Sequence, residues 1–152
     1  MKKIIIRNFE PNDAASAAEI IRNNLLTINA RKYPEQIIQN LIKIYSADDL
    51  IRQSSNKTMI VAIMNDKVIG IGSLLNDFIS TVFVNIHHHG TGIGRKMMNT
   101  LELIAKENNI KTISLHASIN AINFYEMQGY QVVSNVESED FGKSILMKKD
   151  LL

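Results

Sequence analysis

The chain has 152 residues, of which 45% are hydrophobic and 21% are charged, a balance typical of a folded globular domain. Its formal net charge of +2 is too small to predict a nucleic-acid partner, and no basic run of the needed length appears. The absence of cysteine excludes a disulfide framework, a thiolate metal site and a cysteine nucleophile. The length predicts one domain, residues 1–152.

The sequence contains no sign of a membrane segment. No apolar run approaches the roughly 20 residues that a membrane-spanning helix needs. The basic start Met1-Lys2-Lys3 is followed by an apolar run that Arg7 and Glu10 end too early for a signal peptide. We therefore expect a cytoplasmic protein that does not bind a membrane.

The N-terminal third of the chain predicts one strand followed by helices. Pro11-Asn12-Asp13 places a capping side chain beside a proline, which is typical of a helix start. Tyr33-Pro34 interrupts the helical pattern, because the residue before proline is held extended. The predicted segments are a strand at 3–8 and helices at 14–26, at 35–45 and, as a short piece, at 49–53.

Three strands joined by tight turns come next. Asn65-Asp66 and Asn76-Asp77 are turn sequences between apolar runs, which predicts a meander. Gly129 predicts the end of the last helix. The predicted segments are strands at 58–64, 67–75, 78–85, 111–116, 130–136 and 143–149, and helices at 92–106 and 119–128. The whole order, β-α-α-β-β-β-α-β-α-β-β, predicts an α/β chain with a mixed sheet.

Residues 82–98, VFVNIHHHGTGIGRKMM, combine the end of a strand, a glycine-rich turn and the start of a helix. Gly90, Gly92 and Gly94 permit positive φ and let a ligand approach the backbone without a Cβ in the way. The first N–H groups of a helix are unpaired and lie at the positive end of its dipole, which favours phosphate binding. Arg95 adds positive charge. The same glycines could instead make only a tight strand-to-helix turn.

This segment has neither the Gly-Lys-Ser/Thr ending of a P-loop nor the G-x-G-x-x-G spacing of a dinucleotide site. It resembles the coenzyme A pyrophosphate loop of the GNAT N-acetyltransferase superfamily, written Gln/Arg-x-x-Gly-x-Gly/Ala. Here the motif reads His89-Gly90-Thr91-Gly92-Ile93-Gly94, with histidine at the first position. The family often has Val-x-Pro just upstream, where this chain has Val84-Asn85-Ile86 and no proline.

Residues 115–130, LHASINAINFYEMQGY, resemble a second signature of the same superfamily. That signature is a strand, then Ala-x-x-Phe/Leu-Tyr on a helix, then Gly-Phe/Tyr opening the next strand. Many members carry Asn seven residues before the tyrosine, a position that others fill with serine, as Ser118 does here. The residues that fit are Ala121, Phe124, Tyr125, Gly129 and Tyr130.

The two signatures lie in the right order, and the element order resembles the family from Ile4 to about Met147. The resemblance implies the GNAT acyl-CoA N-acyltransferase fold, α/β (α+β), with a mixed, mostly antiparallel sheet of about seven strands and about four flanking helices. It implies a reaction in which a primary amine directly attacks acetyl-CoA, the cosubstrate, without a covalent enzyme intermediate.

The resemblance also implies roles for individual residues. Backbone groups near Phe83 and Val84 are expected to hold the pantetheine arm and polarise the thioester carbonyl. Tyr125 is expected to protonate the leaving thiolate as general acid. The residues expected to bind coenzyme A are Phe83, Val84, His89, Gly90, Thr91, Gly92, Ile93, Gly94, Arg95, Ser118 and Asn123.

These roles have plainer structural alternatives. Tyr125 could be a half-buried helix aromatic, and Ser118 could be only a helix N-cap. Asn120 and Asn123 could be solvated residues of one helix. The run His87-His88-His89 invites a metal site, but neighbouring side chains of an extended segment point in different directions, so we expect no metal.

The general base and the acceptor are the least defined parts of the site. Strand 78–85 contains no carboxylate, so Asp77 at its start is the nearest candidate base, and water relayed by backbone groups is the alternative. Glu102, further along the glycine-rich helix, is expected at the surface. Small-molecule amines, amino acids, aminoglycosides and peptide or protein amines are all open as acceptors. Side chains available for a cationic acceptor are Tyr33, Glu35, Tyr45, Asp48 and Asp49.

Two other interpretations stay open beside an enzyme. One is a non-catalytic protein of the same fold that binds acetyl-CoA as a sensor or interaction module. The other is a nucleotide-binding α/β module that takes ATP or NAD. The resemblance also implies a possible homodimer, because members of the family often pair through their C-terminal strands.

Overall fold

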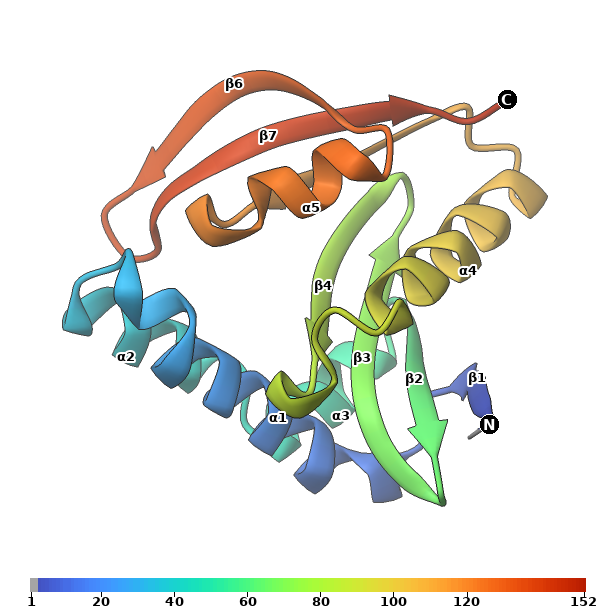
Figure 1. Ribbon diagram of the computed structural model, residues 1–152, viewed down its shortest axis with the longest axis horizontal. Helices are drawn as coiled ribbons and strands as arrows, with labels where there is room; N and C mark the ends of the chain where they lie inside the picture. Colours follow the sequence, from blue (N-terminus) through green and yellow to red (C-terminus); the bar gives the residue numbers. More distant parts are fainter. Residues whose placement is uncertain (1–2) are drawn as a thin grey trace.

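The computed structural model describes residues 3–152; Met1 and Lys2, which begin the segment judged too short for a signal peptide, lie outside them. The centre is a seven-stranded sheet with the order β1-β2-β3-β4-β5-β7-β6 (Figure 1). The pair β4–β5 is parallel and the other five neighbouring pairs are antiparallel. The expected α/β fold with a mixed, mostly antiparallel sheet is therefore confirmed.

The predicted segments match the observed elements within a few residues, although five α-helices flank the sheet where about four were expected. The short third helix begins earlier than expected because Ser46 caps it and accepts a hydrogen bond from the Asp49 N–H. The strands are β1 (Ile4–Asn8), β2 (Thr58–Met64), β3 (Lys67–Leu75), β4 (Phe78–Val84), β5 (Thr112–Ala117), β6 (Gln131–Ser138) and β7 (Gly142–Asp150). The α-helices are α1 (Ala14–Thr27), α2 (Glu35–Lys43), α3 (Ala47–Ser54), α4 (Ile93–Glu107) and α5 (Ile122–Met127).

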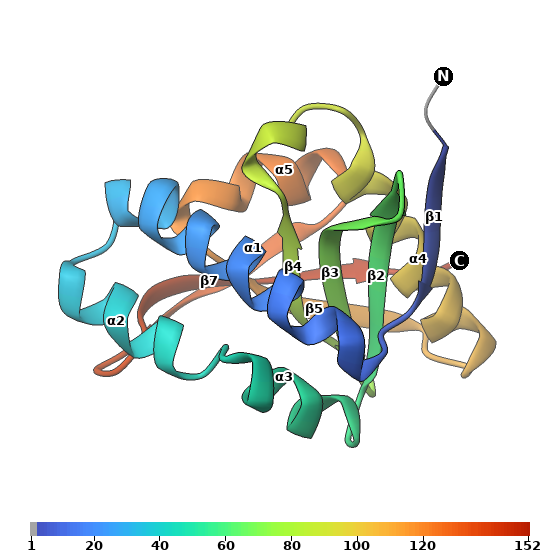
Figure 2. The same cartoon turned by 90° about the horizontal axis from the view of Figure 1, so that it is seen from below.

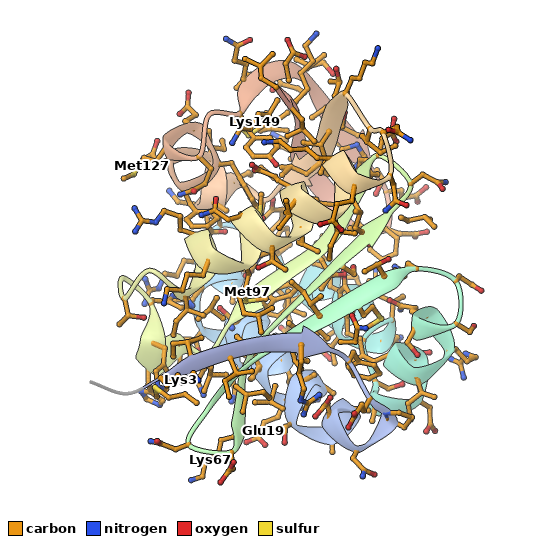
Figure 3. The ribbon with its side chains drawn as sticks, turned by 90° about the vertical axis from the view of Figure 1, so that its right-hand side faces the viewer. Lys3, Glu19, Lys67, Met97, Met127 and Lys149 are labelled. Carbon is orange, nitrogen blue, oxygen red and sulfur yellow. The ribbon has the colours of Figure 1, made fainter. Side chains whose placement is uncertain are left out.

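Helices cover both faces of the sheet, with α1, α2 and α3 on one face and α4 on the other (Figure 2). Met97 of α4 is fully buried between that helix and the sheet (Figure 3). Gly70 and Gly72 of β3 allow α4 to pack closely, since a Cβ on Gly72 would lie 3.2 Å from Leu101 Cδ1. Along residues 3–152, none of the helices combines the length and the apolar composition required to span a bilayer.

Strands β4 and β5 separate after a short parallel contact. Their register contains two pairs, Phe78 with Ser114 and Ile79 with Leu115. Beyond them β4 continues along β3 to Val84, with one extra residue, Ser80, at a register shift. A bulge of this kind bends its strand away from a regular ladder. The two strands therefore diverge at the centre of the sheet.

Glu102 is buried, with 7% of its surface exposed, so the expectation that it lies at the surface is wrong. Its Oε2 accepts a hydrogen bond from the Tyr130 hydroxyl (2.9 Å) and its Oε1 accepts one from Lys149 Nζ (2.8 Å). Burial and the nearby Glu102 charge raise the pKa of Tyr130. The Tyr130 ring packs edge-on against the Tyr125 ring at 6.0 Å. The network thus joins α4 to β7 and supports the helix that carries Tyr125.

Replacing Glu102 by alanine should lower the free energy of unfolding by about 3 kcal/mol, because the substitution leaves the Tyr130 hydroxyl and the Lys149 ammonium without their partner. Urea denaturation at pH 7 measures the change. Asn99→Ala, at an exposed position of the same helix, is the control and should stay within about 0.5 kcal/mol of the wild type. Equal stability of the two variants would show that the network contributes nothing.

Candidate active site

A cleft of about 1240 Å³ opens where β4 and β5 separate. We call its two parts the loop half and the helix half. The loop half is lined by residues 82–84, 88–95, 118, 120, 121, 124, 125, 127 and 128. The helix half is lined by residues of α1, of α2, of the segments that follow these two helices, of the end of β6, of the β6–β7 turn and of the start of β7. A site for one small ligand typically has a volume of roughly 300–1,000 Å³. The cleft is larger than that range, so it has room for two substrates that meet between the strands.

The glycine-rich turn presents backbone N–H groups at the loop half. Gly90 and Gly92 have φ values of +78° and +89°, which side-chain-bearing residues rarely adopt. The first hydrogen bond within α4 runs from the Lys96 N–H to the Gly92 carbonyl, so the three preceding N–H groups have no acceptor inside the helix. A Cβ added at Gly90 or Gly92 would meet nothing within 4 Å. The backbone here is therefore open to a ligand.

Gly94 connects the two sequence signatures. A Cβ at this position would lie 3.0 Å from Phe124 Cζ, tighter than ordinary contact. The glycine therefore lets α5 pack directly against the first turn of α4. Phe124 in turn meets the ring of Tyr125 edge-on at 5.1 Å. The turn that could bind phosphate and the helix that carries the tyrosine are thus held together by one close contact.

The side chain of His89 turns back to the strand that precedes it. Its Nε2 lies 2.8 Å from the Val84 carbonyl, which also accepts a hydrogen bond from Asn24 Nδ2 at 2.8 Å. Because a carbonyl oxygen only accepts, His89 Nε2 carries its proton in this contact. The two bonds occupy both lone pairs of the carbonyl. His89 and Asn24 therefore brace the end of β4, and the Val84 carbonyl is not free for a ligand.

The other histidines of the run face different ways. His87 is exposed and donates its backbone N–H to the Asn85 side chain. His88 lines the cleft, and its buried Nδ1 has no hydrogen-bond partner among the described residues. Within residues 3–152 no group of three potential metal ligands comes together.

Tyr125 is buried to 8% exposure and lines the cleft. Burial raises the pKa of its phenol well above the ordinary value, and the charge that Tyr45 would carry on ionisation raises this pKa further. Burial likewise raises the pKa of Tyr45, which packs edge-on against Phe83 at 5.9 Å. Tyr125 in the loop half and Tyr45 in the helix half therefore both keep their protons at neutral pH.

Most of the residues predicted for the site line the cleft, but two do not. Asp77 is exposed in the turn between β3 and β4, at the opposite end of β4 from the glycine turn. Asn123 is exposed on α5, whereas Asn120 lines the cleft, with its Oδ1 buried and unpartnered among the described residues. The predicted residues on the cleft are Phe83, Val84, His89, Gly90, Thr91, Gly92, Ile93, Gly94, Arg95, Ser118 and Tyr125.

The sequence contained a signal that separates these two asparagines. Ala121, Phe124, Tyr125 and Gln128 all line the cleft. Residues three and four apart share one face of a helix, and this spacing leaves position 123 on another face. Asn120 precedes the helix and is held by a hydrogen bond from its Nδ2 to the Ile28 carbonyl, at 3.1 Å.

Tyr33 builds the wall of the helix half. Its hydroxyl donates to the Lys143 carbonyl at 2.5 Å and accepts from the Ile119 N–H at 2.9 Å. Burial raises the pKa of this phenol, so it keeps the proton that it donates. Nearby, Asn40 Nδ2 donates to the Asp140 carbonyl at 2.8 Å. These bonds join the α1–α2 connection and α2 to the β6–β7 turn and to the residues before α5.

The carboxylates suggested for a cationic acceptor lie elsewhere. Asp49 is the capping-box residue of α3, where its carboxylate bonds to Ser46 and Arg52. Glu35 and Asp48 are exposed on α2 and α3. None of the three is among the residues that line the cleft, whereas Tyr33 and Tyr45 are.

The seven-stranded sheet and its cleft agree with the GNAT fold that the two sequence signatures implied. Residues 29–151 match the family described as Acetyltransferase (GNAT) domain, and the chain belongs to that family.

Solved structures share the fold at low sequence identity. A GCN5-related N-acetyltransferase from Rhodopseudomonas palustris is 22% identical, with a TM-score of 0.90 over 99% of this chain and 98% of that chain. The PaiA N-acetyltransferase from Thermoplasma acidophilum, in complex with coenzyme A, is 21% identical, with a TM-score of 0.82 over 97% and 99%. An aminoglycoside 6'-N-acetyltransferase complexed with coenzyme A is 16% identical, with a TM-score of 0.73 over 97% of each chain.

One curated relative also matches in sequence. The uncharacterized protein YyaT of Bacillus subtilis is 35% identical over 60 residues. The matched segment spans 40% of this chain and 40% of that protein.

Replacing Gly92 by alanine should lower the free energy of unfolding by about 1 kcal/mol, because an L side chain is strained at this positive φ. Gly92→Asn is the matched variant and should cost less, since asparagine tolerates the left-handed region better than alanine. Urea denaturation of both variants measures the order. An alanine variant as stable as the wild type would show that the turn relaxes without strain.

Proposed function

We propose that this protein is an N-acetyltransferase that transfers the acetyl group of acetyl-CoA to a primary amine by direct attack. The observation that carries the proposal is the meeting, in one cleft, of the open glycine turn before α4 and the protonated phenol of Tyr125. Membership of the GNAT acetyltransferase family supports the same reaction class. The two structural relatives in complex with coenzyme A support the same cosubstrate.

The loop half fits the pyrophosphate of coenzyme A. The N–H groups of residues 93–95 and the dipole of α4 favour an anion, and Arg95 adds a cation beside them. The bare Cα positions of Gly90 and Gly92 leave room for close approach. The pantetheine arm then follows the end of β4 beside Phe83, where Ser118 and the unpartnered Oδ1 of Asn120 offer polar contacts.

The chemistry requires one bond to form and one to break. The neutral amine nitrogen attacks the thioester carbonyl carbon, so a C–N bond forms and the C–S bond breaks, with its electron pair moving to sulfur. Tyr125 gives its hydroxyl proton to that sulfur as general acid. The amine nitrogen releases one proton to water, and the tyrosinate recovers one from solvent. The products are an acetamide and free coenzyme A thiol, and no protein group is consumed.

The base is assigned to solvent rather than to a side chain. Asp77 lies outside the cleft, and among residues 3–152 no Asp or Glu lines it. This same observation favours a second candidate function, a protein of this fold that binds acetyl-CoA as a sensor or interaction module without turning it over. Binding without turnover distinguishes the second candidate from the first.

Coenzyme A binding should raise the midpoint of thermal unfolding. At about a hundred times its dissociation constant a ligand adds roughly 2.7 kcal/mol, which moves the midpoint of a domain of this size by about 5–10 °C. Differential scanning fluorimetry with acetyl-CoA, and with ATP as the control, measures the shift. An equal shift with ATP would favour a nucleotide-binding module, and no shift with millimolar acetyl-CoA would remove the proposed cosubstrate.

Replacing Tyr125 by phenylalanine should lower kcat by at least about a hundredfold, because general acid catalysis typically contributes 10²–10⁴. The thermal shift with acetyl-CoA should persist, since the ring that lines the cleft is kept. Tyr130→Phe is the matched control: it removes a phenol outside the cleft and should lower stability while keeping kcat. An unchanged rate in Tyr125→Phe would show that another group protonates the thiolate.

A further inference from the structure

The walls of the helix half are mainly apolar. Leu25 lies at its base with 1% exposure, while Ile44 and Phe141 stand at its edge with 37% and 41% exposed. These side chains come from α1, from the end of α2 and from the β6–β7 turn. A ligand that covers water-exposed apolar surface lowers the free energy of the complex, because that surface is removed from water. The helix half therefore favours an apolar body. Other apolar residues that line it are Leu41 and Val136.

The charged side chains on the cleft are cationic. They are Arg95 in the loop half and Lys143 in the helix half, and the other titratable groups are His88, His89, His116 and the three tyrosines 33, 45 and 125. An ammonium group that binds in the helix half loses hydrating water and is repelled by these cationic side chains, and both effects disfavour its binding. A monoamine avoids this cost by binding as its free base, which is the nucleophilic form. A diamine brings a second ammonium that has to be desolvated without a carboxylate partner.

The helix half is closed on one side by the β6–β7 turn. The β6–β7 turn packs directly on the helical side, because a Cβ at Gly142 would lie 3.4 Å from both Tyr33 and Ile37. The bonds from Tyr33 to Lys143 and from Asn40 to Asp140 hold the turn there. The turn and α2 are therefore in direct contact and form one wall of the helix half, against which the body of the acceptor has to lie.

We propose that the acceptor is a small monoamine whose single primary amine is carried by an apolar or aromatic body, an alkylamine or arylalkylamine, and that polyamines and aminoglycosides are poor acceptors. The inference rests on the proposed function, which supplies the reaction. It departs from what the aminoglycoside 6'-N-acetyltransferase relative acts on, since that likeness concerns the fold alone.

The test compares two monoamines with two amines that carry additional charges. Release of coenzyme A thiol from acetyl-CoA is followed with n-hexylamine, 1,6-diaminohexane, 2-phenylethylamine and kanamycin. We expect kcat/KM for n-hexylamine and 2-phenylethylamine to exceed that for 1,6-diaminohexane and kanamycin by at least tenfold. Equal or higher values for the diamine or kanamycin overturn the inference but leave the proposed function intact. No thiol release with any of the four amines also overturns the inference, whereas the proposed cosubstrate is tested separately by the thermal shift with acetyl-CoA.

A pair of variants locates the effect in the helix half. Ile44→Glu places a carboxylate at the edge of the cleft and should raise kcat/KM for 1,6-diaminohexane relative to n-hexylamine by at least fivefold. Ile51→Glu is the matched control, because Ile51 on α3 is 38% exposed and does not line the cleft. It should leave the ratio unchanged. An unchanged ratio in Ile44→Glu, with the variant folded, overturns the placement of the acceptor body against α2.

Discussion

The separation of β4 from β5 after two residue pairs is the constraint on which the rest of the structure depends. A continuous parallel ladder here would close the sheet and leave no cleft. Instead the backbone of β4 runs on along β3 alone, and its free side faces the gap. This gap persists only if the helices on the two faces of the sheet are fixed separately. One apolar cluster fixes α4 and α5 on one face, and the other fixes α1, α2 and α3 on the opposite face.

The end of β4 shows how this chain accommodates its departures from the family motif. The resemblance sets Gln or Arg at the first loop position and a proline upstream, and the chain has neither. His89 and Asn24 instead converge on the Val84 carbonyl, which fixes the direction in which the strand leaves the sheet. A rigid proline and a pair of hydrogen bonds are different ways to restrict the same stretch of backbone. The glycine turn that follows is held in place by this contact and by the packing of Gly94 on Phe124.

Local chemistry made most of the fold predictable. Asn65, Asp66 and Asn76 adopt positive φ, as their turn sequences indicated, and so the meander was visible in the sequence. The two signatures placed the glycine turn and Tyr125 on the same cleft. Two features could not be predicted because each depends on a partner far along the chain. Glu102 is buried because Tyr130 and Lys149 reach it, and the helical pattern of α4 alone does not reveal them. Tyr33 builds a wall only because it meets Lys143, 110 residues later.

The environment of the cleft affects the two groups that exchange protons in the proposed reaction, the Tyr125 phenol and the amine of the acceptor. Loss of water disfavours any charged form, so it raises the pKa of the Tyr125 phenol and lowers the pKa of an ammonium bound nearby. The first shift keeps the acid protonated, and the second favours the free base of the acceptor. In the proposed reaction the buried phenol of Tyr125 therefore serves as the acid while solvent in the open cleft takes the proton of the amine. The cationic side chains of the cleft then favour an acceptor that brings a single amine.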